Sequence, residues 1–298
     1  MGMPKQVIKL LLEENNYKPI SGDFISFGKQ TVSVGKDELV RLLGKYSHDT
    51  QVVQRYYDDN QLDTKTRHGV NNIEDENVLK MFSDINYNVM DISDYEGANI
   101  IHDLNDPVPE SLHSKFDFLY TGGCLDNVFN PVSLLVNSTN LLKEGGRIAH
   151  YETFQGLLGA YLMFSPEWFF SYYAINGFTD VKVYVCHHKD PNITRFDYST
   201  DLYLWQPYFT RNDKFNYYDA AMNTRGIFYT MVIAEKGSSS TSNRMPVQLQ
   251  YLDDNTVDWR KKYDTFKESD RGLLKGESES EYTLPFNSDH FLYLGSGY

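Results

Sequence analysis

Apolar strand-like runs alternate with helical segments along this chain, and that alternation restricts the fold more than any other feature of the sequence. The strand-like runs are residues 23–27, 87–90, 99–102, 115–120, 147–151, 181–186 and 227–234. Helical periodicity marks residues 7–14, 37–46, 74–82, 131–142 and 165–176. Alternation of this kind favours parallel strands joined by right-handed crossovers. We therefore predict an α/β protein with a doubly wound, mostly parallel sheet of seven strands.

Several segments fall outside this pattern. Residues 48–72 are polar and aperiodic, which indicates an excursion on the surface, and residues 187–225 form an insertion rich in aromatic side chains. The Ser- and Thr-rich residues 238–242 have the composition of a linker. The remainder of the chain has few clear periods and fits either an ordered appendage or a partly mobile tail. We predict a main domain at residues 1–237, followed by a linker and C-terminal appendage at 238–298.

The net charge of the chain limits the kinds of partner that it can bind. The chain carries 28 basic and 41 acidic side chains, a formal net charge of −13. Such a field repels phosphate backbones and anionic lipids, so we expect no nucleic-acid partner. The two cysteines, Cys124 and Cys186, make no disulfide framework, and no apolar run reaches the roughly 18 residues needed to span a bilayer. Together with the lack of a signal-like start, this predicts a cytoplasmic protein without membrane insertion.

Four segments in the ordered middle of the chain carry a resemblance to a known family. They are residues 115–130, 141–148, 164–170 and 176–181. In this order they resemble the fourth strand and its turn, the turn into the fifth strand, a later helix and the sixth strand of class I S-adenosylmethionine (SAM) methyltransferases of the type-11 branch. Ser93–Ala98, with the sequence Ser-Asp-Tyr-Glu-Gly-Ala, resembles a bacterial subgroup of that family. The resemblance covers residues 85–186 well and residues 22–46 weakly.

The resemblance implies a Rossmann-like sheet, SAM as cofactor and S-adenosylhomocysteine (SAH) as product. In a doubly wound sheet the ligand binds beyond the carboxyl ends of the strands, at the switch point. There the resemblance implies that Asp91 accepts both ribose hydroxyl groups, that Ile92 covers the adenine and that Asp103 contacts the adenine amino group, with Leu104 lining the ring. The alternative is that Asp91 and Asp103 only cap or turn the chain.

Two further parts of the cofactor site are implied, and one of them departs from the family pattern. Gly122 and Gly123 follow the fourth strand, where missing side chains let the backbone approach the methionine part of SAM. The family has a glycine-rich turn after the first strand, but this chain has Phe27-Gly28-Lys29-Gln30. That loop either binds SAM through the Gly28 backbone and the polar ends of Lys29 or Gln30, or has lost the cofactor.

Methyl transfer also needs a group that removes a proton from the acceptor. The best candidates are His150 and Glu152 at the end of the fifth strand, with Tyr151 between them, followed by Asp126 and Asn127 in the turn after the fourth strand. His150 and Glu152 share one face of that strand, and Tyr151 points to the other. The alternative for His150 is a core histidine bonded to the backbone. We expect no metal site, because adjacent His187 and His188 would point to opposite faces.

Three functions remain open at this point. The first is a SAM-dependent methyltransferase acting on a small molecule, with O-methylation of a sugar or glycan precursor as the reaction suggested by the aromatic insertion and the subgroup. The second is an inactive methyltransferase-fold binding or scaffold protein, for which the appended C-terminal region could mediate homo-oligomer contacts. The third and weakest is a nucleotide-sugar enzyme on a similar sheet.

Overall fold

The computed structural model describes residues 2–59, 62–63, 66, 72–155, 159–188, 200–207, 226–248, 259–268, 272–274 and 291–296. Its strands are β1 (Gly2–Met3), β2 (Ser21–Phe27), β3 (Thr31–Val32), β4 (Asp84–Asp91), β5 (Ile100–Ile101), β6 (Phe116–Gly122), β7 (Leu142–Gln155), β8 (Asp180–His188), β9 (Thr200–Trp205), β10 (Ile227–Glu235) and β11 (Phe291–Ser296). Its α-helices are α1 (Lys5–Tyr17), α2 (Lys36–Lys45), α3 (Gln51–Asp58), α4 (Asp75–Lys80), α5 (Pro131–Leu141), α6 (Pro166–Ile175) and α7 (Trp259–Glu268). Two 3-10 turns are η1 (Glu110–Leu112) and η2 (Leu125–Asn127).

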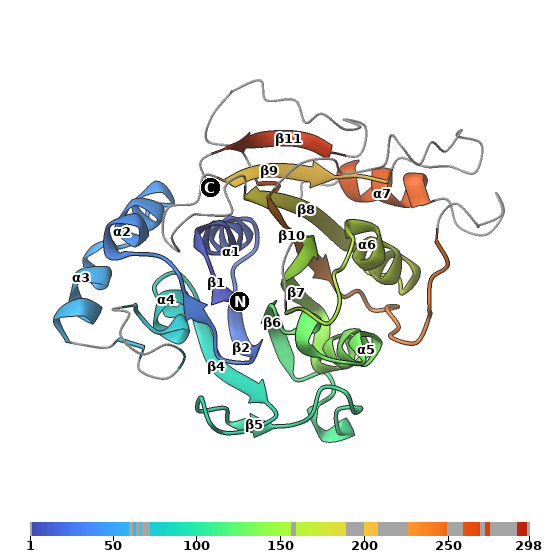
Figure 1. Cartoon of the computed structure of the whole chain (residues 1–298), viewed down its shortest axis with the longest axis horizontal. Coiled ribbons are helices and arrows are strands. Elements are labelled where there is room, and N and C mark those ends of the chain that lie inside the picture. The colour runs from blue at the N-terminus through green and yellow to red at the C-terminus, as the bar shows by residue number, and fades with distance from the viewer. Residues whose placement is uncertain are drawn as a thin grey trace.

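One large sheet organises the described part of the chain, in the order β11-β9-β8-β10-β7-β6-β2-β4-β5 (Figure 1). All seven predicted strands are present in it, so the predicted α/β fold is confirmed. The sheet has nine strands, however, because β9 and β11 extend the edge beyond β8. The four pairings from β7 to β5 are parallel and the other four are antiparallel. The predicted mostly parallel character therefore holds for one half of the sheet.

Helices cover both faces of the sheet, as a doubly wound fold requires (Figure 1). Side chains alternate along β2: Phe24 packs in the core that contains α1, α2 and α4, whereas Ile25 and Phe27 pack in the core with α5, α6 and α7. All three side chains are fully buried. The chain passes from β2 outward to β4 and β5, and then returns to β6 on the other side of β2. The switch point is therefore between β2 and β6.

The expected surface excursion at residues 48–72 contains a helix that the sequence pattern did not predict. Helix α3 buries Val53 completely and packs against α2. Its apolar face consists of few residues within a polar stretch, and this explains why the periodicity was too weak to predict it. Residues 60–61, 64–65 and 67–71 of the excursion lie outside the described residues.

The described C-terminal residues contact the main sheet and its helices. The Thr241 backbone N–H donates to the Asn176 carbonyl oxygen at the end of α6, and the Tyr172 hydroxyl donates to the Ser242 carbonyl oxygen. Phe266 of α7 packs edge-on against Phe170 of α6. β11 pairs with β9. The division of the chain at residue 237 stays a prediction. Within the described residues, no helix combines the length and the apolar character needed to cross a membrane.

Candidate functional site

A cavity of about 460 Å³ opens at the carboxyl ends of β2, β4 and β6, beside the switch point. Its walls come from the first residues after these strands, because parallel strands end at one edge of the sheet. Gly28 comes directly after β2 and turns the chain with a φ of +69°. Its N–H donates to the Met90 carbonyl oxygen of β4. This left-handed conformation suits glycine and turns the chain sharply over the cavity.

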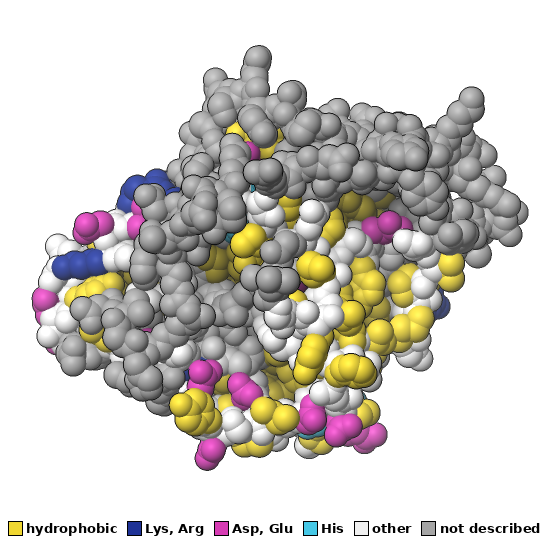
Figure 2. Space-filling view, in the orientation of Figure 1, with side chains coloured by type: hydrophobic (Ala, Val, Ile, Leu, Met, Phe, Trp, Pro, Cys, Tyr) yellow, Lys and Arg dark blue, Asp and Glu magenta, His cyan; other side chains and the backbone are white. Residues whose placement is uncertain are grey.

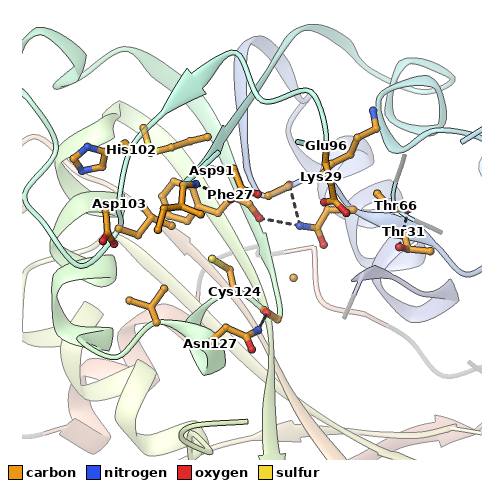
Figure 3. Close-up of a pocket in the computed structure, with 18 of the residues that line it drawn as sticks. Phe27, Lys29, Thr31, Thr66, Asp91, Glu96, His102, Asp103, Cys124 and Asn127 are labelled. Carbon is orange, nitrogen blue, oxygen red and sulfur yellow. Dashed lines mark hydrogen bonds between the residues drawn. The ribbon is translucent and has the colours of Figure 1, made fainter. Parts of the chain in front are cut away.

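All ten residues predicted to bind cofactor line this cavity. They are Phe27, Gly28, Lys29, Gln30, Asp91, Ile92, Asp103, Leu104, Gly122 and Gly123. Figure 3 shows His102 and Asp103 at one end of the cavity and Lys29, Glu96 and Thr66 at the other. The structure therefore brings together residues that are up to 96 positions apart in the sequence.

The two predicted aspartates differ in their hydrogen bonds. The Ile92 N–H donates to Asp91 Oδ1 at 2.6 Å, and the described residues give Asp91 Oδ2 no protein donor. Asp103 Oδ1 accepts from both the backbone and the side-chain nitrogen of Asn105, at 2.9 and 2.8 Å. The backbone hydrogen bond from Asn105 is the main cause that lowers the pKa of Asp103. Asp91 therefore faces the cavity with one free acceptor oxygen, whereas Asp103 also organises its own turn.

The loop after β2 is held by a buried carboxylate in place of glycines. Asp75, the first residue of α4, is fully buried, and its Oδ2 accepts from the Gln30 N–H at 2.7 Å and from the Tyr87 hydroxyl at 2.6 Å. Its Oδ1 lies 3.4 Å from Lys29 Nζ. Burial acts to lower the pKa of Lys29, but the charges of Asp75 and then Glu74 outweigh burial and raise it. Lys29 is thus a neutralised cation at the cavity wall.

The Gln30 side chain replaces part of the missing glycine-rich turn. Its Nε2 donates to the carbonyl oxygens of Phe27 and Gly28, at 2.9 and 3.1 Å (Figure 3). These two bonds use both amide hydrogens, so Oε1 must face the other way. There it lies 2.5 Å from the position that a Cβ on Gly122 would occupy, and it has no partner among the described residues. Gln30 is only 3% exposed, so this acceptor is a buried polar atom that lacks a donor.

Most side-chain donors that line the described cavity already have protein partners. Lys29 pairs with Glu74 and Asp75, and Thr31 donates to Thr66, which in turn donates to Asp63. The Asn127 amide nitrogen donates to Gly123 O at 2.6 Å and to Asp126 Oδ1 at 2.9 Å. Asn105 donates to Asp103, and His102 Nε2 lies 3.1 Å from the Asp106 carbonyl oxygen.

The hydrogen-bond acceptors at the cavity differ from these donors, because several of them have no protein partner. Among the described lining residues, Asp91 Oδ2, the Glu96 carboxylate and Gln30 Oε1 have no protein donor, and the thiol of Cys124 is a weak donor. Burial raises the pKa of that thiol, which keeps it protonated. The cavity is therefore suited to a ligand that brings hydrogen-bond donors.

Of the predicted catalytic candidates, Asn127 lines the cavity, whereas His150, Tyr151, Glu152 and Asp126 do not. His150 is fully buried between β7 and α6, with its Nε2 2.5 Å from the Tyr173 hydroxyl. Burial lowers the pKa of His150 to about 3, so the ring stays neutral. On the opposite face of β7, the Tyr151 hydroxyl accepts from Gln6 Nε2 at 3.0 Å, and Tyr151 is 3% exposed. Both side chains pack in the interior and leave no surface for a substrate.

The two predicted carboxyl groups lie behind the cavity floor. Glu152 is fully buried and accepts from the Thr121 hydroxyl at 2.7 Å; burial first, and then the charge of Asp126, raises its pKa well above the usual range. Asp126 is 2% exposed and accepts from the Thr153 hydroxyl at 2.7 Å, and burial raises its pKa. Neither carboxyl group lines the cavity, although Asp126 orients Asn127, which does.

Sequence reasoning missed two functional candidates. Asp75 supports the loop after β2, and Glu96 lines the cavity. The signal for Glu96 was present, because Ser93–Ala98 was already one of the segments that carried the family resemblance. Asp75 gave no signal, since its role depends on a contact with a residue 45 positions away. Trp205, in the insertion rich in aromatic side chains, is 5% exposed and packs against Phe170 in the core.

Neither a protein-family model nor a curated protein matches the sequence. Among solved structures, the chain is similar to the CurJ carbon methyltransferase, with a TM-score of 0.37 and 13% identity over 78% of this chain and 55% of that one. A SAM-dependent methyltransferase from Thermotoga maritima gives a TM-score of 0.34 and 13% identity, over 78% and 90% of the two chains. Phosphoethanolamine N-methyltransferase 2 from Haemonchus contortus gives 0.38 and 11%, over 77% and 52%.

These matches extend over part of the other proteins. The chain spans about half the length of the first structures that it matches. The three structures described above are methyltransferases, which is the class that the sequence segments resemble. At such identities and scores the similarity carries no argument about function, which rests on the cavity itself.

Proposed function

We propose that this chain is a SAM-dependent methyltransferase that acts on a small molecule. The observation that carries the proposal is the set of free acceptors at the switch-point cavity: Asp91 Oδ2, the Glu96 carboxylate and Gln30 Oε1. SAM brings the matching donors, namely a ribose diol, an adenine amino group and an α-ammonium group, and it adds a sulfonium charge. When bound, SAM supplies an activated methyl group, and the protein's task is to position it against the acceptor.

The cavity residues fit this ligand in a defined order. We assign the ribose hydroxyl groups to Asp91, because a carboxylate oxygen can accept from a diol. Ile92, which is 66% exposed, and Leu104 would cover the adenine, with Asp103 near its amino group. The opposite end, at Gln30 and Gly122, would take the methionine part.

A phosphate-bearing ligand fits this cavity poorly. Nucleotide phosphates bind where backbone N–H groups at a helix start point at them, usually directly after the first strand. Here a two-residue strand, β3, follows the loop, and α2 begins only at Lys36. Of the described residues at the wall, the one cationic side chain, Lys29, is already paired with two carboxylates. This disfavours a nucleotide-sugar enzyme.

The surface that would hold the methyl acceptor is less defined than the cofactor cavity. Phe129 and Tyr161 are 82% and 68% exposed and form an edge-on aromatic pair, and the Tyr161 N–H donates to Asp126 O of η2. Flat aromatic faces beside η2 would suit a ring-shaped acceptor, which supports a sugar or glycan precursor. Most of the aromatic insertion at residues 187–225 lies outside the described residues.

A second candidate function is ligand binding without catalysis. It is favoured by the enclosure of His150, Tyr151, Glu152 and Asp126, which leaves the proposed proton acceptors out of reach of the cavity. Their catalytic roles stay predictions. Retained SAM binding without methyl transfer to any acceptor would support this candidate.

The deciding experiment is isothermal titration calorimetry of the purified chain with SAM, SAH and a UDP-sugar. We expect SAM and SAH to bind and the UDP-sugar not to bind. Incubation with methyl-labelled SAM and a pool of small metabolites then separates the enzyme from the binding protein. Absence of binding at millimolar SAM would overturn the proposed function, and tight binding of the UDP-sugar would favour the nucleotide-sugar alternative.

A further inference from the structure

The described wall of the cavity carries an excess of negative charge. Three carboxylates line it, those of Asp91, Glu96 and Asp103, against one cation, Lys29. Lys29 is matched by two further carboxylates, because its Nζ lies 3.7 Å from Glu74 and 3.4 Å from Asp75. The charge of Lys29 is therefore shared between these two carboxylates and the three that line the cavity.

Glu96 is the least satisfied of these carboxylates. The described residues give it no hydrogen-bond donor. Burial raises its pKa, the negative charges of Asp91, Asp63 and Asp75 add to the rise, and together they outweigh the opposing charge of Lys29. It lies at the end of the cavity where Lys29 is found, away from Asp103 (Figure 3). An acidic group held against other acidic groups is unfavourable in the empty protein and becomes favourable when a cation is bound.

A second, independent observation points to the same end of the cavity. Gln30 Oε1 is a buried acceptor without a partner, and it lies over Gly122. A buried acceptor of this kind costs free energy unless a ligand or water donates to it. The Glu96 end of the cavity is thus short of donors as well as short of positive charge.

We propose that Glu96 makes the cavity selective for the positively charged sulfonium cofactor, SAM, over its neutral thioether product, SAH. The inference rests on the proposed function. SAM and SAH share the adenosine and the zwitterionic amino-acid part, so the contacts of Asp91 and Gln30 with the two ligands are equivalent. The two ligands differ by one methyl group and one positive charge at sulfur. The negative charge of Glu96 attracts the positive sulfonium of SAM and has no such attraction for the neutral sulfur of SAH. Release of the product is favoured as a result.

The test compares affinities for SAM, SAH and sinefungin, in which an amine-bearing carbon replaces the sulfonium centre. Calorimetry is run near pH 8 and at low salt with the parent chain, with Glu96→Gln and with Asp94→Asn. Asp94 is an exposed carboxylate in the same loop that does not line the cavity, so it is the matched control for a lost charge. We expect the parent to bind SAM more tightly than SAH, and Glu96→Gln to reduce that ratio by about three- to tenfold.

Other readouts follow from the same charge. Asp94→Asn should leave the SAM-to-SAH ratio unchanged, sinefungin should behave like SAM, and a rise in salt from about 50 to 500 mM should narrow the ratio in the parent. Because Glu96 is repelled in the empty protein, Glu96→Gln should raise the melting temperature of the ligand-free chain, whereas loss of a merely structural residue would lower it.

The outcomes separate this inference from the proposed function. If SAM and SAH both bind but Glu96→Gln leaves their ratio as in the parent, the inference on Glu96 is wrong and the cofactor assignment stands. A parent that binds SAH more tightly than SAM also overturns it. If neither ligand binds, the proposed function fails and the inference fails with it.

Discussion

Asp75 Oδ2 accepts the backbone N–H of Gln30 at 2.7 Å, and this contact joins the start of α4 to the loop that follows β2. The loop has a single glycine where the family pattern would have several. A fully buried carboxylate, bonded also to the Tyr87 hydroxyl and near Lys29, keeps the loop in place. The wall of the cavity therefore depends on a residue that does not itself line the cavity.

Replacement of Asp75 tests this support. Asp75→Ala would leave Lys29, the Gln30 N–H and the Tyr87 hydroxyl without their partner, so we expect a loss of about 3–5 kcal/mol in the free energy of unfolding. Tyr87→Phe removes one of these bonds and should cost about 1 kcal/mol. Urea unfolding measures both effects. Glu76→Ala, at the exposed neighbouring position, is the control and should stay within about 0.5 kcal/mol of the parent.

Asp91 is the most direct test of the cofactor assignment. A hydrogen bond to a charged group contributes roughly 1.5–3 kcal/mol, so Asp91→Ala should weaken SAM binding about 10- to 150-fold. Asp91 is half-buried at the strand end, so the ligand-free fold should keep nearly its full stability. Calorimetry and thermal unfolding, with Asp94→Ala as the control, check the two parts. Parent-like SAM affinity in Asp91→Ala would show that Asp91 only shapes its turn.

Gly122 tests the close approach at the methionine end of the cavity. A Cβ there would lie 2.5 Å from both Gln30 Oε1 and the Tyr120 hydroxyl oxygen, and 3.0 Å from the Gly2 carbonyl oxygen. We expect Gly122→Ala to cost about 1–3 kcal/mol of stability, because this crowded site can relax only by moving the side chains of both Gln30 and Tyr120. It should also weaken SAM binding. Gly44→Ala, at an exposed position in the last turn of α2, should instead stabilise the chain by up to about 1 kcal/mol.

His150 predicts a pH dependence of stability. Burial holds its pKa at about 3 in the folded protein, against roughly 6.5 in an unfolded chain. Between these values the unfolded state binds one more proton, so this contribution is fully present above pH 6.5 and is lost as the pH falls toward 3. The slope is at most about 1.4 kcal/mol per pH unit.

The variant His150→Gln lacks this titration and should show a flatter dependence of unfolding free energy on pH than the parent, between pH 4 and 6. Urea unfolding across that range measures the difference. Parallel slopes in the parent and the variant would mean that His150 is reached by solvent and titrates normally in the folded state.

The sequence by itself determined where the strands of the central half-sheet end. Asp91 ends β4 and Gly122 ends β6, and the parallel order predicted from the alternation brings these ends together at one edge. This geometric rule is why all ten predicted cofactor residues line one cavity. It needs only strand positions and their direction, which short-range periodicity reveals.

The tertiary structure alone decided which polar residues face the cavity and which are enclosed. His150 and Glu152 have the right strand position, but Tyr173 of α6 bonds His150 and Thr121 of β6 bonds Glu152, and both side chains are fully buried. Asp75 and Glu96 have their roles through neighbours that are distant in sequence. Burial and charge coupling depend on what packs against a side chain from other elements, and local pattern carries no information on that packing.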